Sequence, residues 1–148
     1  MEWTVLLHPE FDPEFAELPE AAQDELAALS QLLKHFGPQL SRPHADTLNG
    51  SKHANMKELR FDAADGAWRV AFAFDSKRAA ILLVVGDKSG TNEKRFYRKL
   101  IEKADRRFDA HLADLKEVKN AQDDRRPNEK LAGKPARKGG RPRKGPRR

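Results

Sequence analysis

The feature that most restricts the fold is a pair of β-patterned segments, residues 55–61 and 67–74, separated by a turn sequence. The turn contains Asp65-Gly66, and Asp-Gly favours the two-residue loop of a β-hairpin because both central residues of such a loop need positive φ. A third segment, residues 79–85, is apolar at every position, as in a central strand that is covered on both faces. The sequence therefore predicts an antiparallel meander whose last strand is central.

Helical periodicity flanks the meander on both sides. Residues 19–36 carry apolar side chains at steps of three and four, and a shorter stripe over residues 11–18 predicts that the two segments form a helical hairpin. A second amphipathic helix is predicted from Thr91 onward. Residues 38–54 are expected to form a loop, with room for one short strand around Leu48. With a first strand at residues 3–7, the fold class is α+β: a small antiparallel or mixed sheet of about four strands, with an N-terminal helical hairpin and a C-terminal helix.

Positive charge is concentrated towards the C-terminal end. The formal net charge is +6, and residues 116–148 contain 13 Lys and Arg against 4 Asp and Glu, which leaves residues 1–115 with a net charge of −3. The C-terminal range is rich in Arg, Lys, Pro and Gly and cannot form a core. We therefore expect one domain over residues 1–115, followed by a disordered basic tail. Many cations on such a segment attract nucleic acid through counterion release.

Part of this tail resembles the AT-hook, a short extended element that places arginine in narrow A·T-rich minor grooves. The resemblance rests on a Gly-Arg-Pro core that begins at Gly140. The residues expected to contact nucleic acid are Arg141, Pro142, Arg143 and Lys144. A solvated polycation without sequence preference is the alternative interpretation.

Several chemistries lack the residues that they need. The chain has no cysteine, which excludes a disulfide scaffold, a Cys-ligated metal and a thiol nucleophile. Its His and carboxylate residues show no ligand spacing, so we expect neither a metal nor a cofactor. Gly-rich phosphate loops, Ser-centred elbows and HExxH patterns are missing as well. No apolar segment approaches the roughly 20 residues of a membrane span, so we expect a cytoplasmic protein without a membrane partner.

Two arginines on the predicted hairpin are the strongest candidates for a functional site. A two-residue loop at the Asp-Gly sequence would pair Arg60 with Ala71 and place Arg69 diagonally to Arg60, on the same face and about 7–8 Å away. Small partners leave this face open. Two guanidinium groups at its border suit a phosphodiester, because each can donate parallel hydrogen bonds to phosphate oxygens. Ordinary surface salt bridges with Glu58 and Asp62 are the alternative.

Further candidates are other cations, histidines and one phenol. A lysine close to arginines can have its pKa lowered enough to act as a base, and a phenol can assist proton transfer, stack on a base or simply pack. The candidates of these two kinds are Lys57, Lys88, Lys94 and Tyr97, the only tyrosine of the chain. His44 and His53 flank a loop, and an imidazole pair can carry out acid-base chemistry on RNA. The side chains expected to bind RNA are Lys94, Arg95, Arg98 and His53.

Three short motifs carry a resemblance to a known family. They are Leu48-Asn49-Gly50, Met56-Lys57-Glu58-Leu59-Arg60 and Gly66-Ala67-Trp68-Arg69-Val70. In their order along the chain, residues 1–115 resemble the RelE/HigB-like toxins of bacterial type II toxin–antitoxin modules, and in particular the phage-derived Gp49-like subgroup. The resemblance implies a RelE-like microbial RNase fold and an endonuclease that cleaves mRNA, usually in the ribosomal A site, without a metal.

The resemblance also implies roles for residues and partners. In such toxins the 2′-OH of a nucleotide attacks the adjacent phosphate while cationic side chains stabilise the charge on its oxygens. Arg60 and Arg69 would clamp the phosphate, the three lysines would supply a base or charge, and Tyr97 would stack or donate a proton. The expected partners are mRNA, the ribosome and a helix-turn-helix antitoxin, through which the complex can bind operator DNA. A non-catalytic nucleic-acid-binding module of the same fold, with its tail on DNA or the ribosome, is the alternative.

Overall fold

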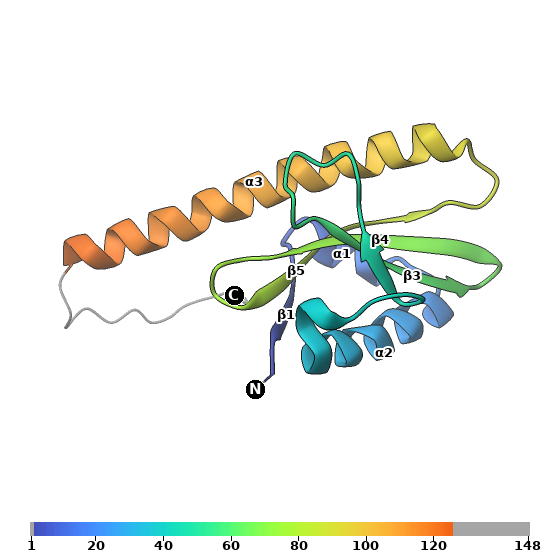
Figure 1. Ribbon diagram of the computed structural model, residues 1–148, viewed down its shortest axis with the longest axis horizontal. Helices are drawn as coiled ribbons and strands as arrows, with labels where there is room; N and C mark the ends of the chain where they lie inside the picture. The colour runs from blue at the N-terminus through green and yellow to red at the C-terminus, as the bar shows by residue number, and fades with distance from the viewer. Residues whose placement is uncertain (1, 126–148) are drawn as a thin grey trace. The chain divides into compact units, whose positions relative to one another are not determined.

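The computed structural model describes residues 2–125, with side chains as far as Val118. Contacts between residues divide the chain into two units, Met1–Leu112 and Ala113–Arg148, and the sheet and both hydrophobic cores lie in the first unit. The elements in chain order (Figure 1) are β1 (Thr4–Leu7), α1 (Phe11–Ala16), α2 (Glu20–Phe36), a 3₁₀ turn (Gly37–Gln39), β2 (Ala45–Thr47), β3 (Lys57–Ala63), β4 (Gly66–Phe74), β5 (Ala79–Asp87) and α3 (Glu93–Arg125). None of the helices in the described range combines the length and the apolar character that a membrane crossing needs.

The strands form one mixed sheet in the order β1-β5-β4-β3-β2. β1 pairs with β5 in parallel, and the other neighbours are antiparallel. β5 is therefore central, and its residues from Ala79 to Val84 are all buried, which confirms the prediction from its apolar sequence. The sheet has five strands instead of about four. The additional strand, β2, pairs with β3 through only three residues, which are too few to show an alternating pattern.

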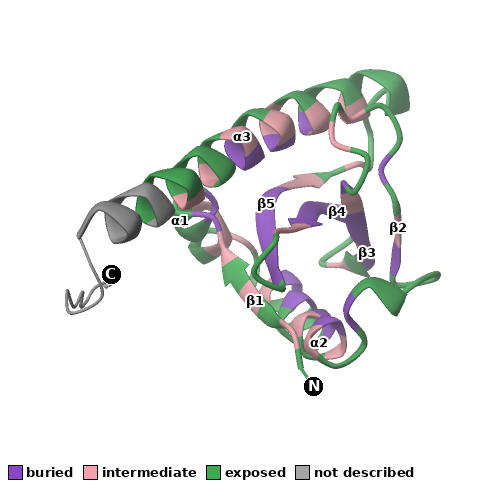
Figure 2. Cartoon of the chain, turned by 60° about the vertical axis from the view of Figure 1, so that its left-hand side comes forward, coloured by how far each residue is buried: buried purple, intermediate pink, exposed green. Residues whose placement is uncertain are grey.

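Helices cover both faces of the sheet (Figure 2). α1 and α2 cover one face, where Leu33 of α2 belongs to the same core as Phe72 of β4. α3 covers the other face, where Phe108 belongs to the same core as Ile81 of β5. Each fully buried Leu, Ile or Phe stabilises the fold by roughly 1.5–3 kcal/mol. The predicted α+β class and the C-terminal helix are confirmed, and the N-terminal pair differs in detail because α1 has only six residues.

The β3–β4 hairpin has a different register from the predicted one. Ala63 pairs with Gly66, so the loop consists of Ala64 and Asp65, whose φ angles are 49° and 61°. Gly66 instead begins β4, where an added Cβ would lie 2.8 Å from the indole Nε1 of Trp68. The prediction was wrong because glycine serves here to permit a close approach and does not supply the positive φ of the loop. The register moves by two residues, and an even shift keeps every side chain on its predicted face.

A β-bulge in the β4–β5 pairing is stabilised by a buried arginine. Leu83 of β5 is the extra residue, since the register shifts between Ala71 and Phe72 of β4. The carbonyl oxygen of Leu83 accepts a 2.7 Å hydrogen bond from Nη1 of Arg107, which is buried in α3. The guanidinium also donates to both carboxylate oxygens of Glu14 in α1, at 2.9 and 2.6 Å, and these hydrogen bonds raise the pKa of Arg107. One buried cation therefore joins α1, β5 and α3.

α3 continues past residue 115, where the sequence predicts the end of the domain, and ends at Arg125. The rest of the predicted basic tail lies outside the described residues. This part contains the AT-hook-like residues Arg141, Pro142, Arg143 and Lys144. The domain boundary and the disorder of the tail stay predictions.

Candidate active site

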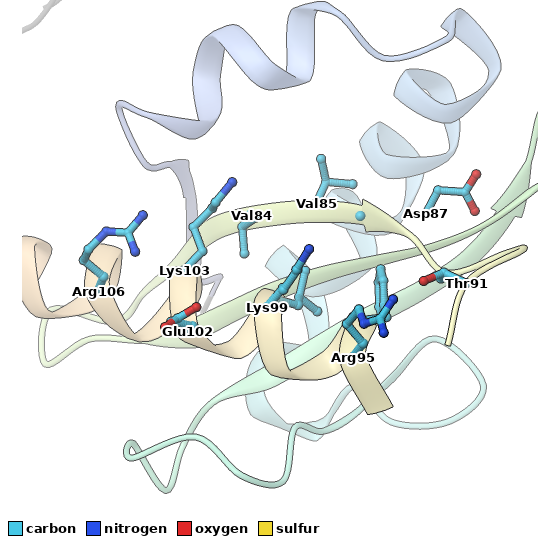
Figure 3. Close-up of a pocket in the computed structure, with 12 residues that line it drawn as sticks. Val84, Val85, Asp87, Thr91, Arg95, Lys99, Glu102, Lys103 and Arg106 are labelled. Carbon is cyan, nitrogen blue, oxygen red and sulfur yellow. The ribbon is translucent and has the colours of Figure 1, made fainter. Parts of the chain in front are cut away.

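Two hollows in the described part of the chain have cationic linings. The larger one, about 510 Å³, lies between the end of β5 and the first turns of α3 (Figure 3). α3 approaches β5 closely there because Gly86 has no side chain, and an added Cβ would lie 2.7 Å from the ring of Phe96. The cations that α3 presents on the rim at helical spacing are Arg95, Lys99, Lys103 and Arg106. Such a rim attracts polyanions, and it includes Arg95, one of the predicted RNA-binding residues.

The smaller hollow, about 320 Å³, contains the predicted pair of arginines. Its lining residues are Arg42, Pro43, Arg60, Phe61, Asp62 and Arg69. Arg60 of β3 pairs directly with Arg69 of β4, on the face that α3 covers. The prediction that the two arginines share a face is confirmed. The predicted diagonal relation is wrong, because the shifted hairpin places the two residues opposite each other, where Cα atoms lie about 4.5–5.5 Å apart.

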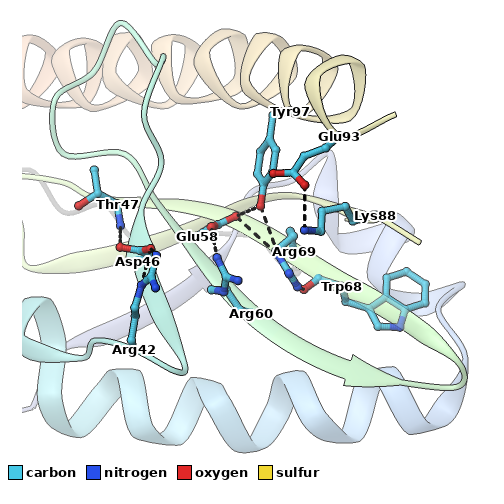
Figure 4. A network of polar contacts seen from close by, with 10 residues as sticks. All are labelled: Arg42, Asp46, Thr47, Glu58, Arg60, Trp68, Arg69, Lys88, Glu93 and Tyr97. Carbon is cyan, nitrogen blue, oxygen red and sulfur yellow. Dashed lines mark hydrogen bonds and ion pairs between the residues drawn. The ribbon is translucent and has the colours of Figure 1, made fainter. Parts of the chain in front are cut away.

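A buried carboxylate, Glu58, contacts both arginines (Figure 4). Like charges directly opposite each other destabilise a sheet, so this pair needs compensation. Nη1 of Arg60 donates a 3.0 Å hydrogen bond to Oε2 of Glu58, and Nε of Arg69 lies 4.0 Å from Oε1. The side chains of Glu58 and Arg69 are only 5% and 8% exposed, whereas that of Arg60 is 32% exposed. The arrangement is therefore a largely buried ion cluster with one arginine facing outward.

Tyr97 of α3 completes this cluster. Its hydroxyl donates a 2.9 Å hydrogen bond to Oε1 of Glu58 and accepts one of 3.3 Å from Nε of Arg69. Burial raises the pKa of Tyr97, and the hydrogen bond to the Glu58 carboxylate raises it further. The phenol therefore keeps its proton at neutral pH, so Tyr97 can donate a hydrogen bond or a proton but is not a base.

Arg42 is a third arginine at the smaller hollow, and its place there was not predicted from the sequence. It lies in the loop before β2, where the sequence has no periodicity that could assign it to a face. The pairing of β2 with β3 brings this loop next to the arginine pair. Arg42 forms a 2.7 Å ion pair with Asp46, and this contact holds the pKa of Asp46 below its usual range. The side chain of Arg42 is 75% exposed, so its guanidinium is accessible to a ligand.

The predicted lysines lie in different places. Lys57 alternates in β3 with Glu58, so it belongs to the opposite face of the sheet from the arginine pair. Lys88 follows β5 and forms a 3.5 Å ion pair with Glu93 at the start of α3. In Figure 4 this ion pair lies beside Tyr97. The catalytic roles of both lysines stay predictions.

The other three predicted RNA-binding residues lie on α3 and in the loop before β3. Lys94 and Arg98 are exposed on α3. His53 is held in place, because its Nε2 lies 2.8 Å from Oδ1 of Asp109 and its ring packs edge-on against Phe108. Within the described part of the chain, none of these three side chains forms a hydrogen bond or an ion pair with the arginine cluster. Their roles in RNA binding stay predictions.

The chemical capacity of the smaller hollow is to bind an anion. Hydrogen bonds within the described residues use one nitrogen of Arg60 and two of Arg69, so each guanidinium keeps donors for a ligand. A planar guanidinium donates in parallel to two oxygens of a phosphate and stays charged at any relevant pH. Among residues 2–125, no three His, Asp or Glu side chains gather in the way that a metal site needs.

This α+β arrangement is the fold of the toxin RelE. A mutant of E. coli RelE in its free state superimposes with a TM-score of 0.54, over 72% of this chain and 98% of that chain, at 11% sequence identity. Residues 13–109 match the family of phage-derived Gp49-like proteins, DUF891. The chain belongs to this family and is a RelE/HigB-like toxin, which confirms the prediction from its motifs.

Two proteins of Mycobacterium tuberculosis (strain ATCC 25618 / H37Rv) are similar in sequence. The one assigned as toxin HigB3 is 43% identical over 109 residues, which cover 74% of this chain and 93% of the relative. The one assigned as toxin HigB2 is 41% identical over 93 residues, which cover 62% of this chain and 46% of the relative. The similarity to HigB3 therefore extends over nearly the whole relative, whereas the chain spans about half the length of HigB2.

Proposed function

We propose that this chain is a ribosome-dependent mRNA endonuclease that inhibits translation as the toxin of a type II toxin–antitoxin module. The observation that carries the proposal is the arginine cluster. Arg60 and Arg69 lie opposite each other and line a hollow. Glu58 accepts a hydrogen bond from Arg60, and Tyr97 accepts one from Arg69 and donates one to Glu58. Membership of the RelE/HigB-like toxins supports the same reaction. The proposed chemistry uses side chains of this chain and the 2′-hydroxyl of the RNA while the RNA is bound to the ribosome.

In the proposed reaction the RNA supplies its own nucleophile. The 2′-oxygen forms a bond to the adjacent phosphorus, its proton leaves to a base, and the bond between phosphorus and the 5′-oxygen breaks. The departing oxygen takes up a proton, so the products are a 2′,3′-cyclic phosphate and a 5′-hydroxyl end. Arg60 and Arg69 stabilise the charge that builds on the equatorial oxygens, and one such donor contributes about 10²–10³ in rate. Lys88 is the candidate for the base or for a stabilising charge, and Tyr97 is the candidate for the proton donor.

The proposed partners follow from the class of toxin. We expect mRNA on the ribosome as the substrate and a helix-turn-helix antitoxin as the inhibitor, whose complex with the toxin can bind operator DNA. The protein would then act in the cytoplasm, where ribosomes translate. Co-purification of the chain with the product of an adjacent small reading frame would test the antitoxin directly.

The test of the activity uses the purified full chain in a translating extract, with transcript ends mapped by primer extension. We expect cuts within the translated region, and Arg60→Ala with Arg69→Ala should slow cutting by at least about 10³-fold. Lys77→Ala is the control, because it removes an exposed cation from the β4–β5 turn, away from the hollow. If the double variant cuts as fast as the parent, the assignment of the site is wrong.

The cationic rim of α3 favours a second candidate, a non-catalytic nucleic-acid-binding module. In that case the wild-type chain would bind RNA or ribosomes without cutting transcripts. Lys99→Ala with Lys103→Ala would weaken binding and lower its dependence on salt, because fewer counterions are released. Cleavage by the wild-type chain excludes this alternative.

A further inference from the structure

We propose that Glu58 is a positioning residue for RNA cleavage: its carboxylate orients the guanidinium of Arg60 directly and that of Arg69 through the hydroxyl of Tyr97. This inference rests on the proposed endonuclease function. It goes beyond that function because it requires a negative charge at a site that must bind an anion. A carboxylate weakens anion binding, so its contact with two phosphate-binding arginines needs a separate reason.

The burial of Glu58 sets it apart from a surface salt bridge. The residue is 4% exposed, and a carboxylate is retained in such a place only when hydrogen bonds satisfy its oxygens. Both oxygens of Glu58 accept hydrogen bonds, one from Arg60 and the other from Tyr97. By contrast Asp62, which lines the hollow, is exposed and forms no ion pair within the described part of the chain. Glu58 is therefore the carboxylate that compensates the arginine pair.

The contacts of Glu58 fix the direction of both guanidinium groups. Arg60, which lines the hollow, uses Nη1 for Glu58, and this leaves Nε and Nη2 without a hydrogen bond to the described residues. Arg69 uses Nε for the Tyr97 hydroxyl and Nη1 for the carbonyl of Trp68, which leaves Nη2. Because a guanidinium is planar, hydrogen bonds on one edge determine where its other N–H groups point. Without Glu58 the two cations repel each other and lose this common orientation.

The inference predicts opposite effects on binding and on catalysis. Glu58→Gln keeps the size of the side chain and removes its charge. The hollow then becomes more positive, so the KM for mRNA–ribosome complexes should stay the same or fall. Loss of orientation should lower kcat by about 10²-fold, the effect of a misplacement of about 1 Å. Glu25→Gln, an exposed acid on α2, is the matched control and should change neither constant.

A second readout does not depend on cleavage. Tyr97 is the only tyrosine of the chain, so the ultraviolet absorbance of the phenolate, measured as the pH is raised, reports the ionisation of this one residue. Glu58 raises the pKa of Tyr97, so Glu58→Gln should move the titration midpoint to lower pH, whereas Glu25→Gln should leave it in place. An unchanged midpoint in Glu58→Gln overturns the proposed contact between Glu58 and Tyr97.

Two further variants separate positioning from folding. Tyr97→Phe removes the hydroxyl that links Glu58 to Arg69 and that is also the candidate proton donor. If the link works as proposed, the double variant with Glu58→Gln loses less rate than the product of the two single losses, because the residues act as one unit. Glu58→Asp keeps the charge that the fold needs but shortens the reach of the carboxylate, so kcat should fall without a rise in KM.

Each outcome decides between the proposals. If the wild type cleaves and Glu58→Gln keeps its kcat, the positioning role is overturned and the endonuclease function stands. If KM rises as kcat falls, together with a lower melting temperature, Glu58 is only a structural ion pair and the inference is overturned. If the wild-type chain cuts no transcript, the endonuclease function itself fails, and the positioning role for cleavage fails with it.

Discussion

Removal of the Arg107 guanidinium tests how far the fold depends on one buried cation. Arg107→Met keeps most of the volume of the side chain. The buried carbonyl of Leu83 then loses its 2.7 Å hydrogen bond, at a cost of about 1–3 kcal/mol. Glu14 loses its partner too, but its side chain is 35% exposed, so hydration limits this contribution to about 1 kcal/mol or less. We therefore expect the free energy of unfolding to fall by about 1–4 kcal/mol.

Urea unfolding followed by tryptophan fluorescence measures this loss, because Trp3 and Trp68 both lie in the first unit. Glu14→Gln is the control, since it removes the ion pair and leaves the hydrogen bond to Leu83 intact. It should cost about 1 kcal/mol or less. The reasoning is refuted if Arg107→Met is no less stable than Glu14→Gln, because the Leu83 carbonyl would then not depend on the guanidinium.

Two further predictions concern stability. Burial lowers the pKa of His8 from 6.5 to about 4, so between these pH values the unfolded chain binds a proton that the folded chain does not. The free energy of unfolding should fall by up to roughly 3 kcal/mol as the pH drops through this window. In urea unfolding, the free energy of unfolding of His8→Asn should depend less steeply on pH than that of the wild type. Equal slopes for the two proteins would contradict this prediction. Gly66→Ala would place a Cβ 2.8 Å from Nε1 of Trp68 and 2.9 Å from Oδ2 of Asp87, and should cost about 1–3 kcal/mol. A Cβ added at Gly90 would have no other atom within 4 Å, so Gly90→Ala should lower the free energy of unfolding by only about 1 kcal/mol, through its positive φ. Equal losses of stability in the two variants would count against the contact with Trp68.

Most of the fold could be predicted because its elements carry strong periodic patterns. The central strand β5 is apolar on both faces, and the structure buries it between two cores. β2 was harder to predict because three residues between Pro43 and Gly50 show no alternation. The hairpin register was misassigned because a short-range rule places glycine in the loop. Here the indole of Trp68, which packs over the turn, decides where Gly66 must lie.

The site could be predicted only in part, for a related physical reason. Strand alternation places Arg60 and Arg69 on one face in either register, so their common face followed from sequence alone. Alternation also places Glu58 on that face, but it does not reveal that Tyr97 of a distant helix would share its carboxylate. Arg42 lies in a loop, where no period indicates direction. Its place beside the hollow depends on the pairing of β2 with β3.

The even step between the two hairpin registers has a consequence for how such a site can change. Both registers bury the same apolar side chains. A shift of the register by two residues would therefore move Arg60 along strand β4 by about 6–7 Å, and every side chain would stay on its face of the sheet. Alterations confined to the turn can therefore re-space the cations while the packing beneath stays intact. The register that the turn selects, and not the packing of the core, therefore sets the distance between the two guanidinium groups.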